Sequence, residues 1–397
     1  MRVEGGSDMR KLLLVAVLVA WSADARAGEG PALDEKLAQL TKAESLTIEG
    51  KGFIRYWYDI QDGDAATEGD GEPHDNSIEI WRFYFGARAR LAPWLTLRLT
   101  SDVGPEKKHK TSEAGDHSHD SAATEGTGAG THTHDVPGET SYQLFLKFAW
   151  LEATLARGLS LRAGIVDNPH NDFTDGLWGY RFVARNAGEE FKLWNTADLG
   201  AYLRYELPSG LGNVVAGVFN GAGYKSALDT DATKDAFGQF VLAPLAPLGE
   251  ALARIQVAGF VQAQMTGDAE RERLITWSGF AGYRDAWFML GYMVMGRNNR
   301  PAEGTGDPFN GLGHSVLARF DTPWKVGLLG RFTRYDTNTG DGEATPATSE
   351  ALAGISYAPV KLFSVAASSA LTWQEKVAGG DETETGIKAM LSTEINF

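Results

Sequence analysis

The chain has 397 residues, of which 43% are hydrophobic and 22% charged, and its mean hydropathy is −0.25. These values exclude a disordered chain, a collagen-like repeat and a protein built from many membrane-spanning helices. Cysteine is absent, which excludes disulfides, thiolate metal sites and cysteine nucleophiles. The net charge of −15 argues against a broad nucleic-acid surface, so we expect no nucleic-acid partner.

Residues 1–27 follow the pattern of a secretory signal peptide. Arg10 and Lys11 precede an apolar run that is too short to span a bilayer, and an A-x-A cleavage site ends at Ala27. The stretch before Met9 is acidic, so we expect translation to start at Met9. A buried N-terminal helix is the alternative. The pattern predicts export across the inner membrane.

Residues 28–44 form a short segment of their own. Leu33, Leu37 and Leu40 recur at helical spacing, which predicts a short periplasmic helix or a stub for oligomerisation. A frayed tail is the alternative interpretation.

From residue 45 to Phe397 the sequence has the period of two that marks strands with one apolar and one polar face. In 78–91, for example, apolar residues alternate with polar ones, apart from a slip of one position at Ile80–Trp81. This pattern predicts sixteen strands, at 46–61, 77–91, 94–103, 139–155, 159–168, 198–207, 212–221, 236–245, 252–266, 273–284, 286–296, 313–321, 324–336, 348–358, 361–374 and 383–397.

The connections between these strands alternate strictly between tight and long ones, and the long ones are acidic, glycine-rich or irregular. Bacterial outer-membrane barrels have an even number of antiparallel strands, short periplasmic turns and long external loops. We therefore predict an all-β fold in which 45–397 forms a transmembrane antiparallel β-barrel in the outer membrane of a Gram-negative bacterium. Lipid and lipopolysaccharide would surround it. A secreted β-sandwich or solenoid is the alternative.

Two stretches carry a resemblance to a known family. Residues 148–152 and 161–169 read FAWLE and LRAGIVDNP, and 82–91 reads RFYFGARARL. In layout and in these motifs the chain resembles the phosphate-selective porins of the O/P type. The resemblance implies a sixteen-stranded, usually trimeric barrel that passes small anions along lumenal arginines. The arginines here are more scattered than in that family, and the sequence shows no lysine cluster at the mouth of the pore.

Arginines fall on the polar face of the early strands, where we expect them to line the pore. An arginine that faces lipid at mid-depth costs about 2–4 kcal/mol, so these side chains should point inward. An arginine-lined wall would attract phosphate, sulfate or carboxylates. Alternatively these arginines pair with Asp102, Glu152 and Glu206, as in a general diffusion pore. The predicted pore-lining residues are Arg82, Arg88, Arg90, Arg98, Arg162 and Arg204.

The long connection 169–197 is the candidate constriction loop. It follows the fifth strand and is rich in aromatic residues, which would be costly to expose to water in an external loop. We expect it to fold into the barrel. The alternative is a loop packed over the mouth or onto a neighbouring subunit. Its candidate charged residues are Arg181, Arg185, Lys192, Glu189 and Glu190.

One connection holds five of the eight histidines, including His117, His119, His132 and His134. His-x-His places both imidazoles on one face of an extended chain, where Zn²⁺, Cu²⁺ or Ni²⁺ could bind. Glycine, serine and threonine fill the rest of the connection, which is typical of a solvated spacer. We expect that it binds no metal and that the protein needs no cofactor.

The sequence thus predicts a porin, in which small hydrophilic solutes, and anions such as phosphate above all, diffuse passively through a water-filled channel. We expect a homotrimer. Two alternatives stay open, namely a non-selective general porin and an adhesin or receptor barrel with a closed lumen. An enzyme is not expected, because no G-x-S-x-G nucleophile motif occurs.

Overall fold

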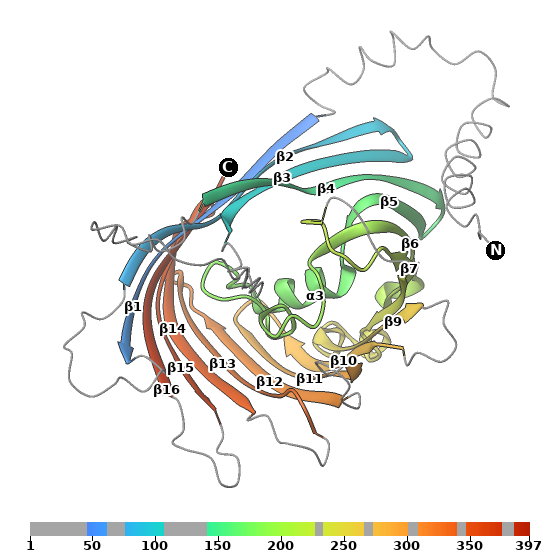
Figure 1. Ribbon diagram of the computed structural model, residues 1–397. Coiled ribbons are helices and arrows are strands. Elements are labelled where there is room, and N and C mark those ends of the chain that lie inside the picture. The colour runs from blue at the N-terminus through green and yellow to red at the C-terminus, as the bar shows by residue number, and fades with distance from the viewer. Residues whose placement is uncertain are drawn as a thin grey trace, which may run out of the picture.

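Figure 1 shows a computed structural model of the chain, in which the strands enclose a barrel. The structure describes residues 46–61, 76–106, 141–226, 233–265, 273–300, 309–339, 347–374 and 385–397. The predicted signal peptide and the segment 28–44 lie outside these described residues.

Sixteen strands occur within the described residues, and all of them belong to one sheet. They are β1 (Leu46–Gln61), β2 (Asn76–Ala92), β3 (Leu95–Glu106), β4 (Ser141–Ala156), β5 (Leu159–Asp167), β6 (Ala197–Leu207), β7 (Gly212–Phe219), β8 (Lys234–Leu242), β9 (Ile255–Met265), β10 (Ile275–Arg284), β11 (Phe288–Arg300), β12 (Phe309–Asp321), β13 (Val326–Asp336), β14 (Thr348–Val360), β15 (Phe363–Gln374) and β16 (Thr385–Asn396).

Each strand pairs antiparallel with its neighbours in sequence, and β1 pairs with β16 to close the sheet. The C-terminal residue completes this seam, because Phe397 accepts a backbone hydrogen bond from Gly50 (2.9 Å) and donates one back (3.1 Å). Closure leaves no unpaired strand edge in the barrel. The predicted sixteen-stranded antiparallel barrel is confirmed.

Within the described residues the helical elements are short and lie between strands. They are α3 (Pro169–Trp178), α4 (Ala187–Glu190), η2 (Pro208–Gly210), η3 (Ala246–Leu248) and η4 (Leu252–Arg254). Because η4 occupies the start of the ninth predicted strand, β9 begins at Ile255 rather than at residue 252. No helix in the described part of the chain is long and apolar enough to cross a membrane.

The outer face of the barrel is apolar. On β2, Phe83 and Phe85 point outward and are 38% and 51% exposed, whereas Tyr84 between them packs against the buried side chains inside. Trp324 in the connection between β12 and β13 is 77% exposed. An apolar outer face with an aromatic residue near its rim is what a bilayer requires of a barrel.

The slip in the sequence pattern at Ile80–Trp81 is a β-bulge. Phe53 of β1 pairs with Arg82 while Ile54 pairs with Ile80, so Trp81 is the extra residue. The bulge turns Trp81 inward, where it is 8% exposed. A strict count of two back from Phe83 would place this ring on the outer face, and the bulge explains why it lies inside.

Candidate functional site

Residues 168–196, here called the inner loop, connect β5 to β6 inside the barrel. Asn168 caps α3 by accepting hydrogen bonds from the first N–H groups of the helix, and Pro169 occupies the first position, where no N–H is needed. Gly179 ends α3 with φ 72°. Asn186 caps α4 in the same way as Asn168 caps α3. The sequence of the loop therefore fixes two short helices.

Aromatic packing holds the inner loop to the wall. The ring of His170 stacks on Phe260 of β9 at 4.6 Å between centroids, and Trp194 meets the same histidine edge-on at 4.8 Å. His170 is fully buried, and neither ring nitrogen has a hydrogen-bond partner. Burial lowers the pKa of His170 to about 3, so the ring is neutral at physiological pH.

Polar contacts hold the loop to the same side of the barrel. The Tyr180 hydroxyl contacts Asp321 of β12 (3.2 Å) and Ser356 of β14 (3.0 Å). Arg331 of β13 donates to the backbone carbonyl of Arg185. Figure 1 shows α3 within the ring of strands. The loop thus contacts strands from β9 to β14. It also contacts Gln239 of β8, which donates to the Pro169 carbonyl (3.4 Å), and Trp81 of β2, which lies 6.0 Å from the guanidinium of Arg185.

A network of charges links α3 to α4 within the inner loop. Arg181 pairs with Asp175 (2.6 Å) and with Glu189. Burial alone would lower the pKa of Arg181, but the two carboxylates outweigh it and raise that pKa well above its ordinary value. Burial would likewise raise the pKa of Glu189, yet the guanidinium of Arg181 lowers it. Asn186 adds a hydrogen bond of 2.6 Å to Asp175.

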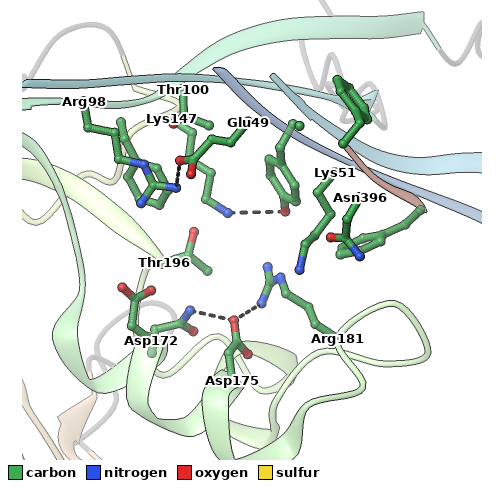
Figure 2. Close-up of a pocket in the computed structure, with 16 residues that line it drawn as sticks. Glu49, Lys51, Arg98, Thr100, Lys147, Asp172, Asp175, Arg181, Thr196 and Asn396 are labelled. Carbon is green, nitrogen blue, oxygen red and sulfur yellow. Dashed lines mark hydrogen bonds and ion pairs between the residues drawn. The ribbon is translucent and has the colours of Figure 1, made fainter. Parts of the chain in front are cut away.

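Two cavities lie between the inner loop and the barrel wall. The first, of about 400 Å³, separates α3 from β1–β4, and Figure 2 shows Arg98, Thr100 and Lys147 on its strand side opposite Asp172 and Asp175. The second has a volume of about 500 Å³. Arg98 and Asp172 line both cavities, so the two cavities adjoin each other beside these two residues. The charged residues lining the second cavity are Arg88, Arg98, Arg162, Asp167, Asp172, Arg204 and Arg284.

The six predicted arginines differ in their partners. Arg88 and Arg90 have no ion pair within the described residues, whereas each of the other four has a carboxylate partner. These pairs are Arg82 with Asp102 (3.2 Å), Arg98 with Glu49 (2.8 Å), Arg162 with Glu152 (2.6 Å) and with Asp167, and Arg204 with Glu206 (4.0 Å). The structure therefore contains the ion pairs of the general-pore alternative and, beside them, unpaired arginines.

Several lumenal cations lie over aromatic rings. The guanidinium of Arg162 is 4.1 Å from the centroid of Trp150, and the ammonium group of Lys147 is 4.5 Å from that of Tyr84. Lys147 was not predicted as a pore-lining residue, because a bulge in β4 sets its direction. Arg284 of β10 was not predicted either, although alternation alone places it on the inner face.

The remaining predicted site residues do not line the two cavities or lie outside the described residues. In the inner loop, Arg185 lies 3.6 Å from Glu189, while Glu190 and Lys192 line neither cavity. The candidate histidines, His117, His119, His132 and His134, lie outside the described residues. Among the described residues no group of three or more His, Cys, Asp or Glu side chains could hold a metal ion.

No protein-family model matches the chain, and no curated protein matches it in sequence. Solved structures match it in fold. The outer-membrane channel DcaP of Acinetobacter baumannii is 10% identical with a TM-score of 0.57, over 90% of this chain and 99% of that one. An anion-selective porin from Comamonas acidovorans is 11% identical with a TM-score of 0.56, over 89% and 99%.

The trimer form of OmpT, an outer-membrane protein of Vibrio cholerae, is 11% identical with a TM-score of 0.51, over 89% of this chain and 100% of that one. At such low identity the likeness shows the fold alone. The resemblance to phosphate-selective porins stays a prediction. The fold is that of bacterial outer-membrane porins, in agreement with the location predicted from the sequence.

Proposed function

We propose that the protein is an outer-membrane channel through which small hydrophilic anions diffuse passively. The observation that carries the proposal is the second cavity, which five arginines and only two carboxylates line. Selectivity depends on the charges that line the lumen and not on the net charge of the protein. Inside a narrow lumen these charges are screened less than on an open surface, so a small excess can bias permeation.

Arg88 is the decisive residue in this argument. It lines the second cavity and has no ion pair within the described residues, so its charge is available to a passing solute. Arg162, by contrast, is already neutralised by Glu152 and Asp167. A guanidinium remains charged at every physiological pH and can bind a carboxylate or a phosphate with two hydrogen bonds.

A non-selective general porin is the second candidate, and the ion pairs of Arg82, Arg98, Arg162 and Arg204 favour it. We further infer that the channel works as a homotrimer, as the trimer form of a structure with the same fold suggests. The expected solutes are inorganic anions such as phosphate and small carboxylates.

Charge reversal at Arg88 tests the proposal. In a planar bilayer under a KCl gradient, Arg88→Glu should reduce the chloride preference of the purified protein or reverse it. Arg254→Glu is the control, because Arg254 lies in η4 between β8 and β9 and lines neither cavity. Equal zero-current potentials for wild type and Arg88→Glu would overturn the proposal in favour of the non-selective pore.

A further inference from the structure

The first cavity contains hydrogen-bond donors that the protein leaves without acceptors. Lys147 is 6% exposed, and no carboxylate among the described residues lies within ion-pair distance of its ammonium group. Its polar contact is the Tyr84 hydroxyl at 3.3 Å. The Thr100 hydroxyl is buried with no partner, and so is Nε of Arg98, whose terminal nitrogen pairs with Glu49. Unsatisfied buried donors are costly, so such a group of them requires an explanation.

The acidic residues across the cavity do not supply the missing acceptors. Asp175 already accepts hydrogen bonds from Arg181 (2.6 Å) and Asn171 (3.1 Å). Asp172 is exposed to the lumen and lies beside Asp167. The protein around it displaces much of the surrounding water, and this together with the charge of Asp167 raises the pKa of Asp172 well above its ordinary value. Asp172 and Glu189 interact with Lys147 electrostatically, but neither forms a hydrogen bond or an ion pair with it. Glu49 also lines this cavity, and its Oε1 makes no hydrogen bond, but it lies in an ion pair 2.8 Å from the terminal nitrogen of Arg98. Once this ion pair is counted, the hydrogen-bonding capacity that remains unused belongs to donors, which select an anionic ligand.

A bulge in β4 places Lys147 there. Phe148 pairs with Thr100 of β3 while Leu146 pairs with Ser101, which leaves Lys147 as the extra residue. Lys147 and Phe148 are both buried inside the barrel as a result, although strict alternation would turn one of them toward lipid. Bulges of this kind redirect a side chain locally and are frequent beside functional sites.

We propose that Lys147, Thr100 and Nε of Arg98 form an oxyanion-binding subsite that holds one phosphate or carboxylate group of a permeating solute. Figure 2 shows the three side chains on one side of the cavity. An anion bound there accepts charge-assisted hydrogen bonds from the ammonium and guanidinium groups, and a hydroxyl hydrogen bond from Thr100. This inference rests on the proposed function, because the subsite is where a permeating anion would bind transiently on its way through the channel.

Block of chloride current tests the subsite. In planar bilayers at pH 7 and constant ionic strength, added inorganic phosphate or acetate should reduce the single-channel chloride current of the wild-type protein in a saturable way. Lys147→Met should raise the half-blocking concentration at least tenfold, while Lys147→Arg should keep it within about threefold. Thr100→Val, which keeps the side-chain shape, should raise it about threefold to tenfold.

Lys388→Met provides a matched control. Lys388 also lies over an aromatic ring, at 4.5 Å from the centroid of Trp57, but it pairs with Asp59 (3.3 Å) and lines neither cavity. Its loss should leave the block unchanged. Block by phosphate alone assigns the subsite to phosphate, and block by acetate alone assigns it to carboxylates. An anion-selective channel that neither probe blocks, or equal block in wild type and Lys147→Met, overturns the subsite while leaving the proposed function intact.

Discussion

Acidification should release the inner loop from the barrel wall, because His170 is buried there as a neutral ring without hydrogen-bond partners. Protonation would place a positive charge between Phe260 and Trp194, where no acceptor replaces water. A proton therefore binds far more tightly to the undocked loop than to the docked one. The perturbation is a change of pH from 7 to 4.5.

The two pKa values give the size of the effect. Docking lowers the pKa of His170 to about 3, whereas an exposed histidine has a pKa of about 6.5. The contribution of His170 to docking is complete above pH 6.5 and is lost as the pH falls from there toward 3. At pH 4.5 the loss amounts to about 2.7 kcal/mol, or roughly a hundredfold change in the docking equilibrium.

The absence of native cysteine provides the assay. Thr174 of α3 is 4% exposed, so Thr174→Cys should react with dithiodipyridine only when the loop undocks. Exposed Ser226 supplies the reference variant Ser226→Cys, which cancels the intrinsic pH dependence of the reaction. The ratio of the two rates should rise about a hundredfold between pH 7 and 4.5.

His170→Phe isolates the histidine contribution, because it keeps the stack on Phe260 and removes the titrating group. Asp172 acts in the opposite direction, since its pKa is raised in the docked loop and protonation there favours docking. That opposing effect is present in both backgrounds, so the difference between them measures His170. The same pH profile in the His170→Phe background and in the parent would refute the reasoning.

Three further predictions concern stability and metal binding. Arg181→Met leaves Asp175 and Glu189 without their guanidinium, which should cost about 3–5 kcal/mol and raise the labelling rate of Thr174→Cys at pH 7. Gly164→Ala should lower the temperature at which the folded barrel unfolds in SDS gels. Gly164 has φ +126°, and a Cβ there would lie 2.2 Å from the carbonyl oxygen of Ala149. An unchanged unfolding temperature would contradict this prediction. Deletion of 109–134 should leave conductance intact, and calorimetry of the full chain should show no Zn²⁺-specific heat.

The barrel could be predicted from the sequence because apolar and polar residues alternate along each strand and so identify its lipid-facing and lumen-facing sides. Phe83 and Phe85 are apolar where lipid is the neighbour, and Arg82 alternates with them. The strict order of tight and long connections then fixes the antiparallel topology. Both signals are local, so they do not depend on contacts between distant parts of the chain.

The site was less predictable because bulges and cross-strand contacts decide it. Strict alternation gives no reason for Lys147 and Phe148 to face the lumen together, and only the pairing with β3 shows why they do. The ion pair between Arg98 and Glu49 joins β3 to β1 across β2, a contact that requires the register. The aromatic content of the inner loop did indicate burial, but it could not identify Phe260 as the residue on which His170 packs.

The central claim is that the lumen prefers anions although the chain carries a net charge of −15. The zero-current potential of the purified wild-type protein in a planar bilayer under a KCl gradient measures this preference directly. The arginines around the second cavity predict a potential of the sign set by chloride permeation. A potential of the sign set by potassium permeation would contradict the account.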